Sequence, residues 1–166
     1  MQKEETTFFI NDFMEDDVDE IKEPENEKVC RKHFKNMTKE ERLYLLTIKD
    51  RLLRRGVTFA KHALDRMDER FIKEKDVLRA LKNGQILEYK KTDKDEVIAV
   101  RGCHINRRNE QVYVIFSISH NKVITTYSNK HWTAYKKMKN LEKYDTNFSI
   151  EIPEYYKRRI QFYYAK

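Results

Sequence analysis

Three side chains that could handle an anion recur along one short segment, FAKHALDRMDER at residues 59–70. His62, Arg66 and Arg70 are spaced four apart and therefore share one edge of a helix. Imidazole can exchange a proton near neutral pH, and a guanidinium can hold a phosphate with two hydrogen bonds. Like charge from the arginines should make His62 easier to deprotonate. The segment predicts an anion-binding or catalytic edge; the alternative is a structural histidine hydrogen-bonded to backbone.

Another cation stands in the middle of an apolar strand, EVIAVRGCHI at residues 96–105. Arg101 is costly there unless its face of the strand is wet or paired. Thr126 and Tyr127 place hydroxyl groups in a later apolar strand, where an ordinary solvent-facing position is the alternative. His104 is a second candidate for proton transfer. These residues extend the list of groups that could act on a bound anion.

Other catalytic chemistry has little support in the sequence. The histidines after residue 100 lack Cys or carboxylate companions at metal-ligand spacing, and no phosphate-binding glycine loop occurs. We therefore expect neither metal nor cofactor. Cys30 and Cys103 fit reduced thiols of a cytosolic protein. The acidic N-terminus does not resemble an export signal and no apolar run could cross a membrane, so we expect a cytoplasmic protein without membrane contact.

Charge is distributed unevenly along the 166 residues, whose formal net charge is +7. Residues 1–28 hold 11 Asp or Glu and 3 Lys, a net charge of −8, which leaves +15 on the remaining chain. A body this basic should attract polyanions in a salt-dependent manner, although general solubility is the alternative. We expect four cations to contribute to nucleic-acid contact: Lys61, Arg70, Arg107 and Arg108.

Helical patterns occupy the first half of the basic body. Thr38 and Glu41 form a capping-box pattern before a leucine-rich helix that should end at Gly56. Thr58 could cap the next helix, which contains His62. A third helix should follow Ile72 and end at Gly84.

Four short β-branched and aromatic runs follow Gly84, separated by polar turns. Such connections join neighbouring antiparallel strands. We therefore predict an α+β fold in which N-terminal helices pack on a four-stranded antiparallel meander. The expected organisation is an acidic–hydrophobic arm at 1–28, an α+β core at 29–130, and a helical extension at 131–166.

The arm mixes acidic residues with Phe8, Phe9, Phe13 and other apolar side chains, unlike ordinary disordered tails. It could fold back over the basic body, or it could recruit an antitoxin or another protein partner. Solvated disorder is the third possibility.

The helix FAKHALDRMDER, the helix FIKEKDVLRALKNGQILE and the strands ending in VITTYS together resemble a family of small bacterial domains of unknown function. That family shows a Lys-His-Ala-x-x-Arg helix, a second helix ending in Asn-Gly, and a strand ending in Thr-x-Tyr or Thr-Tyr. The resemblance covers residues 58–128. It extends to the RelE and BrnT toxins and to the wider barnase–EndoU–colicin–RelE group of metal-independent ribonucleases.

The resemblance implies RNA cleavage in which the ribose 2′-hydroxyl attacks phosphorus, leaving a 2′,3′-cyclic phosphate and a 5′-hydroxyl. Such a reaction needs a base, an acid and cations for the added phosphate charge. Carried onto this chain, His62 would be the base or the acid, and Arg66 and Arg101 would clamp the phosphate. Thr126 or Tyr127 would position the phosphate or supply a proton.

Two classes of function follow from these patterns. The first is a toxin-like, metal-independent endoribonuclease or RNA-binding domain, regulated by its acidic arm. The second is a non-catalytic binding protein of phage or mobile-element origin, which engages nucleic acid or inhibits a protein partner.

Overall fold

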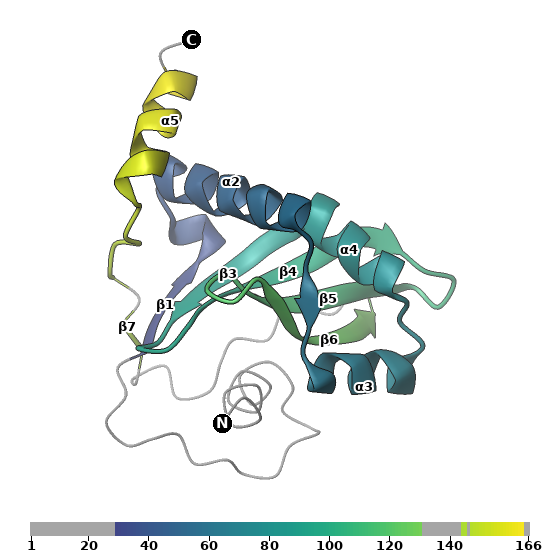
Figure 1. Cartoon of the computed structure of the whole chain (residues 1–166). Coiled ribbons are helices and arrows are strands. Elements are labelled where there is room, and N and C mark those ends of the chain that lie inside the picture. The colour runs from purple at the N-terminus through teal and green to yellow at the C-terminus, as the bar shows by residue number, and fades with distance from the viewer. Residues whose placement is uncertain (1–28, 131–143, 146, 165–166) are drawn as a thin grey trace.

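The computed structural model describes residues 29–130, 144–145 and 147–164, and its centre is a seven-stranded sheet (Figure 1). The strands lie in the order β2-β6-β5-β4-β3-β1-β7. In chain order the elements are β1 (Val29–His33), η1 (Phe34–Asn36), α2 (Lys39–Arg55), β2 (Thr58–Phe59), α3 (Lys61–Arg70), α4 (Glu74–Asn83), β3 (Gln85–Lys91), β4 (Glu96–Ile105), β5 (Glu110–Ser117), β6 (Lys122–Lys130), β7 (Tyr144–Asp145) and α5 (Glu154–Tyr164). The predicted α+β class is confirmed.

The predicted meander forms the middle of the sheet, where β3, β4, β5 and β6 pair as consecutive antiparallel strands. The prediction of only four strands is wrong. β1 adds to β3 as an antiparallel strand, β7 pairs parallel with β1, and β2 pairs parallel with β6. β2 and β7 have only two residues each, too few for any alternating pattern to be visible in the sequence.

Two of the predicted helix boundaries follow from their capping residues. The Thr38 hydroxyl accepts from the backbone N–H of Glu41, and the Glu41 carboxylate accepts from the N–H of Thr38. This reciprocal pair starts α2, and Gly56 ends it with a φ of 90°, a conformation that favours glycine. The predicted capping box is confirmed.

The predicted cap of the next helix is wrong. Thr58 belongs to β2, where it pairs with Lys122 of β6, and Ala60 precedes α3 without a side-chain cap. The N–H of Ala60 donates to the carbonyl of Val123 at 2.9 Å. Sheet pairing therefore holds residues 58–60 extended and attaches the start of α3 to the edge of the sheet.

The two faces of the sheet differ in character. On the first face, apolar side chains such as Ile98, Val100 and Phe116 form one cluster with buried residues of α2, α3, α4 and α5. The second face has a smaller apolar cluster that includes Val97 and Ala99. Buried charged side chains lie beside that smaller cluster, namely Arg31, Glu88 and Lys90.

The C-terminal segment is attached to α2 through aromatic contacts. Tyr156 of α5 is buried, packs edge-on against Tyr44 with ring centroids 5.2 Å apart, and accepts a hydrogen bond from Arg51. The predicted C-terminal helix after Pro153 is thus confirmed. The helix expected after residue 130 and the arm at 1–28 lie outside the described residues. Within the described part of the chain, no helix is long and apolar enough to span a membrane.

Candidate nucleic-acid interface

The predicted edge of α3 is present. Ala63 and Met67 are buried, whereas His62, Arg66 and Arg70 are half-buried beside them along one edge. The Nε–H of Arg66 donates to Nε2 of His62 at 3.3 Å, and another of its nitrogens lies 3.3 Å from the Glu69 carboxylate. His62 and Glu69, each within about one helical turn of Arg66, therefore orient the Arg66 guanidinium.

Burial, together with the positive charge of Arg66, lowers the pKa of His62 below its usual value. Neutral imidazole is the form that can accept a hydrogen bond from Arg66. In this geometry that bond uses the Nε2 lone pair that a general base would need. The arrangement suits His62 for positioning Arg66, and its predicted role as base or acid stays a prediction.

Arg101 is not part of this edge, so the prediction that it clamps one phosphate together with His62 and Arg66 is wrong. It lies on β4, two strands from β6, a separation of about 10 Å. It belongs to the second face of the sheet with Val97 and Ala99, and its guanidinium donates to Gln85 Oε1 on β3 at 2.8 Å. The alternation along the strand correctly predicted that Arg101 shares a face with Val97 and Ala99. It could not predict which face of the sheet would pack against α3.

Thr126 and Tyr127 also do not form a joint site with His62. Thr126 is fully buried, pairs with Val114 and donates its hydroxyl to the carbonyl of Tyr113. Tyr127 points to the opposite face, where its ring stacks on that of Tyr113 at 4.9 Å. Burial raises the pKa of Tyr127, which makes this phenol a poor proton donor. The roles predicted for both residues are therefore not supported by their positions.

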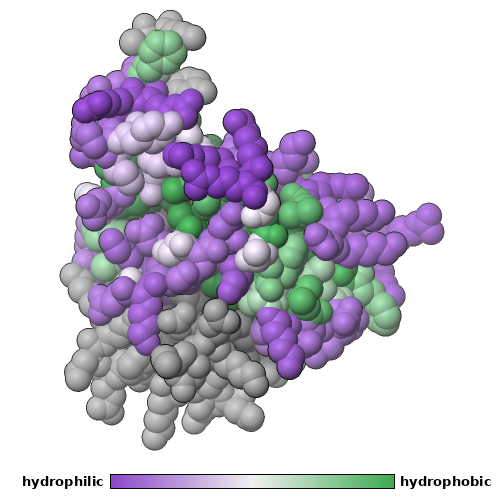
Figure 2. Space-filling model, in the orientation of Figure 1, coloured by the Kyte–Doolittle hydropathy of each residue, from purple (hydrophilic) through white to green (hydrophobic). Residues whose placement is uncertain are grey.

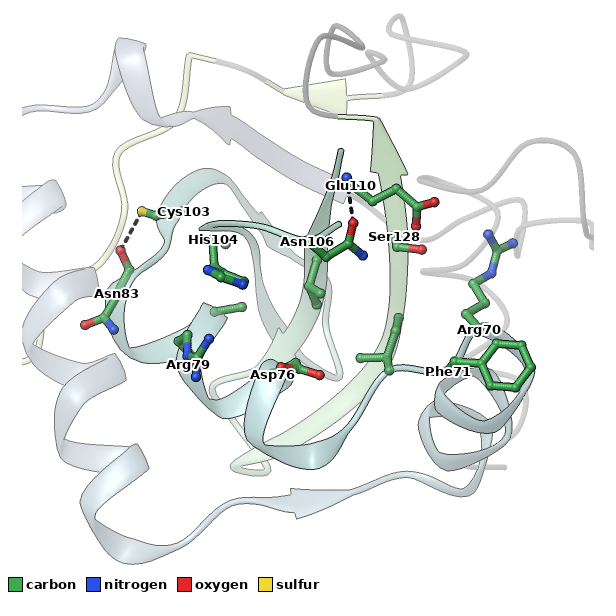
Figure 3. Close-up of a pocket in the computed structure, with 14 residues that line it drawn as sticks. Arg70, Phe71, Asp76, Arg79, Asn83, Cys103, His104, Asn106, Glu110 and Ser128 are labelled. Atoms are coloured by element: carbon green, nitrogen blue, oxygen red, sulfur yellow. Dashed lines mark hydrogen bonds between the residues drawn. The ribbon is translucent and has the colours of Figure 1, made fainter. Parts of the chain in front are cut away.

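A pocket of about 350 Å³ opens at the C-terminal end of the α3 edge (Figure 3). It lies among α4, the end of β4, the start of β5 and the end of β6. Its lining combines apolar side chains such as Ile72 and Val112 with polar ones, among them Arg70, Asp76, Arg79, His104, Asn106 and Glu110. Arg70 thus belongs to both the α3 edge and the pocket.

Two glycines allow α4 to approach the sheet closely enough to form one wall of this pocket. A Cβ on Gly84 would lie 2.2 Å from the carbonyl oxygen of Ala80 and 2.6 Å from that of Arg101, so only glycine fits. A Cβ on Gly102 would lie 3.0 Å from the Ala80 side chain. The β4–β5 register shifts after Arg101. In this stretch of β4, Cys103 donates to the carbonyl of Asn83 at 3.0 Å.

The charges that line the pocket are balanced. Arg70 and Arg79 are opposed by Asp76 and Glu110. Asp76 accepts from the N–H of Lys73 at the start of α4, and Glu110 lies 3.9 Å from the Lys130 ammonium. The acidic and basic side chains that line the pocket therefore leave it without net positive charge.

Two further predicted cations lie in the turn that adjoins the pocket. Arg107 and Arg108 are exposed in the β4–β5 turn, directly after the lining residue Asn106. Lys61, the remaining predicted contact, is exposed at the opposite end of α3, about 14 Å from Arg70 along the helix. Figure 2 shows apolar surface between α3 and α4 with hydrophilic side chains on both sides of it.

The sequence reasoning missed Phe71, Arg79, Asn83 and Glu110. A signal was present for Phe71, because it follows the last residue of a predicted helix, where glycine is usual. No comparable signal marked the other three residues. Their convergence depends on how α4 crosses the β4–β5 hairpin. In the described part of the chain, no group of three or more His, Cys, Asp or Glu side chains is arranged to hold a metal.

Comparison with protein families matches residues 59–128 to a domain of unknown function, DUF4258. No curated protein and no solved structure matches the chain. The matched segment runs from β2 into β6 and includes every residue that lines the pocket. The α3 edge and the pocket therefore belong to one family-matched unit, whereas α2 and α5 lie outside it.

Proposed function

We propose that this protein binds RNA and that the RNA chain crosses the α3 edge and the rim of the pocket. The observation that carries the proposal is the convergence of predicted cations around one hollow. Arg70 lines the pocket, Arg66 precedes it by one turn, and Arg107 and Arg108 occupy the adjoining hairpin turn. Phosphates could contact these guanidinium groups without entering the balanced interior of the pocket.

The net charge supports the same proposal. Residues 29–166 carry a net charge of +15. When a protein binds by neutralising phosphates, the logarithm of its affinity falls linearly with the logarithm of the salt concentration. RNA is preferred over DNA as the polyanion because the α3 and α4 segments resemble ribonuclease toxins. Equal affinity for DNA of the same sequence would reduce the proposal to general nucleic-acid binding.

Binding is tested with a fluorescently labelled RNA oligonucleotide and two double variants that change the net charge equally. The variant Arg107→Glu/Arg108→Glu reverses the charge beside the pocket. The control Arg158→Glu/Arg159→Glu reverses two exposed cations on α5, outside the family-matched segment. We expect only the first variant to lose most of its affinity. Equal losses would show that net charge alone, and not this surface, attracts RNA.

Metal-independent cleavage is a second candidate function, favoured by the presence of His104 and Glu110 in the same pocket. In this reaction one group removes the 2′-hydroxyl proton as the 2′-oxygen–phosphorus bond forms. The other protonates the 5′-oxygen as the phosphorus–5′-oxygen bond breaks, while the Arg79 guanidinium stabilises the negative charge that develops on the phosphate oxygens. Both groups come from the ends of one hairpin, a rigid support for such a pair.

Cleavage is tested by incubating RNA with the protein in EDTA and analysing the products. A 2′,3′-cyclic phosphate that disappears with His104→Asn, while RNA binding persists, supports catalysis in the pocket. Salt-sensitive binding without cleavage supports instead a non-catalytic protein of the phage or mobile-element kind. Loss of cleavage with His62→Ala alone would return the catalytic role to the α3 edge.

The acidic arm, residues 1–28, would either regulate RNA binding or contact a protein partner. Its net charge of −8 is opposite in sign to that of the body. If the arm competes with RNA, removal of residues 1–28 should strengthen binding by the remaining chain. If the arm recruits a partner, its removal should leave RNA affinity unchanged.

A further inference from the structure

We infer that the pocket accepts one unpaired base of the bound RNA, stacked on Phe71, and that the protein therefore selects single-stranded RNA. This inference rests on the proposed RNA binding and names the form of RNA that the site takes. Three independent features carry it: the backbone of Phe71, the charge balance of the pocket, and the cations outside it.

Phe71 occupies a position where an aromatic residue is unfavourable for the fold. It is the residue after α3 and has left-handed backbone angles, φ 55° and ψ 36°, which favour glycine. Its side chain is 81% exposed, the most exposed of the large apolar side chains in the described part of the chain. Neither the helix end nor the core accounts for a phenyl ring there.

Phe71 lines the pocket at its outer edge, next to Arg70 (Figure 3). A flat apolar surface next to a cation is the arrangement on which a base of single-stranded nucleic acid stacks. Because every base has such a face, stacking on Phe71 would not by itself select a sequence.

The lining of the pocket suits a neutral heterocycle better than a phosphate. A phosphate placed inside would face the carboxylates of Asp76 and Glu110, and the repulsion would offset its attraction to Arg79. Those carboxylates can instead accept hydrogen bonds from the amino groups of a base, as carboxylates do from cytosine. The side-chain oxygen of Asn106 is already used, because it accepts from the N–H groups of Arg108 and Glu110.

The size and surroundings of the pocket agree with this assignment. Its volume of about 350 Å³ falls in the range of small-molecule sites. Arg70 of α3 lines the pocket, and the exposed Arg107 and Arg108 directly follow its lining residue Asn106, so phosphates before and after the inserted base could contact these guanidinium groups. A base in a duplex would first have to leave its stack, at a cost that single-stranded RNA does not bear.

The decisive variant is Phe71→Gly, because glycine suits the left-handed backbone. We expect its melting temperature to be equal to or higher than that of the wild type, while affinity for a single-stranded RNA falls roughly tenfold. Phe162→Ala is the matched control, since Phe162 is also exposed, at 63%, but lies on α5. The control should bind RNA as the wild type does.

A fluorescent base provides a second measurement. 2-Aminopurine within the oligonucleotide should be quenched when it stacks in the wild-type pocket and should remain bright with Phe71→Gly. Glu110→Gln replaces one acceptor with an amide that can also donate, so it should lower the preference for oligocytidine over oligouridine. A purely structural role of either residue would produce neither change.

The outcomes separate the two proposals. If the wild type binds neither single-stranded RNA nor an RNA hairpin, RNA binding fails and this inference fails with it. If the wild type binds both forms equally and Phe71→Gly binds as tightly, the base pocket is overturned while RNA binding stands. Preference for the single strand that is lost with Phe71→Gly, together with the loss of 2-aminopurine quenching, supports the inference.

Discussion

The two lateral regions of the sheet use charged residues in opposite ways. Beside β1, Lys32 and Glu41 are buried, and the Glu41 carboxylate accepts from Lys32 at 2.7 Å and from the N–H of Ile150 at 2.7 Å. Beside β6, the charged residues of the pocket are half-buried or exposed around a hollow. The first set joins β1, α2 and the C-terminal segment, whereas the second remains accessible to a ligand. Stability and binding should therefore respond to different substitutions.

The largest effect is expected from Glu41→Ala. The truncation leaves the Lys32 ammonium and two backbone N–H groups without their acceptor, in a place where Glu41 itself is only 3% exposed. We expect the free energy of unfolding in urea to fall by about 3 kcal/mol. Glu40→Ala, at the exposed neighbouring position, should cost far less. A loss below about 1 kcal/mol for Glu41→Ala would remove the distinction between the two regions.

The matching change on the α3 edge is Arg66→Ala, which should affect RNA binding more than folding. Loss of one guanidinium contact to phosphate should weaken binding roughly fivefold to tenfold. Arg55→Ala removes an exposed cation at the end of α2 and serves as the control. Titration of labelled RNA with both variants at one salt concentration measures the difference. Equal affinities would place the RNA elsewhere.

A smaller change should appear in the salt dependence of binding. If Arg107 neutralises one phosphate of a single strand, Arg107→Ala should reduce the slope of log affinity against log salt by about 0.7. Lys82→Ala, an exposed cation at the end of α4, should leave the slope unchanged. Titrations at four or more salt concentrations test this. An unaltered slope for Arg107→Ala would exclude the hairpin turn from the interface.

The smallest effect concerns the pH dependence of stability at His62. Because the pKa of His62 is lowered in the folded state, folding favours its neutral form. The resulting stabilisation is present above the unfolded pKa of about 6.5 and is lost as pH falls below it. The wild type should therefore lose about 0.5 kcal/mol more stability than His62→Gln between pH 7.5 and 5.5, a modest value because solvent screens this edge. If the free energies of unfolding of the wild type and of His62→Gln changed equally with pH, the neutral His62–Arg66 pair would be contradicted.

Local patterns predicted most of the secondary structure correctly. The capping box of Thr38 and Glu41 and the stop at Gly56 are contained within a few residues, so α2 could be assigned without tertiary information. The meander followed from alternating strands with short turns. β1 was missed because its sequence, VCRKH, contains buried charged residues instead of a clear apolar alternation. Those charges are stabilised by partners distant in sequence, such as Glu88 for Arg31.

Spacing along the chain by itself determined that His62, Arg66 and Arg70 share an edge, because residues four apart on a helix are neighbours wherever the helix lies. Only the tertiary structure decided which other groups that edge meets. The packing of α3 on the first face of the sheet at β6 separates His62 from Arg101, which lies two strands away on the second face. The crossing of α4 over the β4–β5 hairpin, which Gly84 and Gly102 permit, brings Arg70, Arg79, His104 and Glu110 around one pocket. This arrangement depends on contacts between residues far apart in sequence, and no local sequence pattern specifies such contacts.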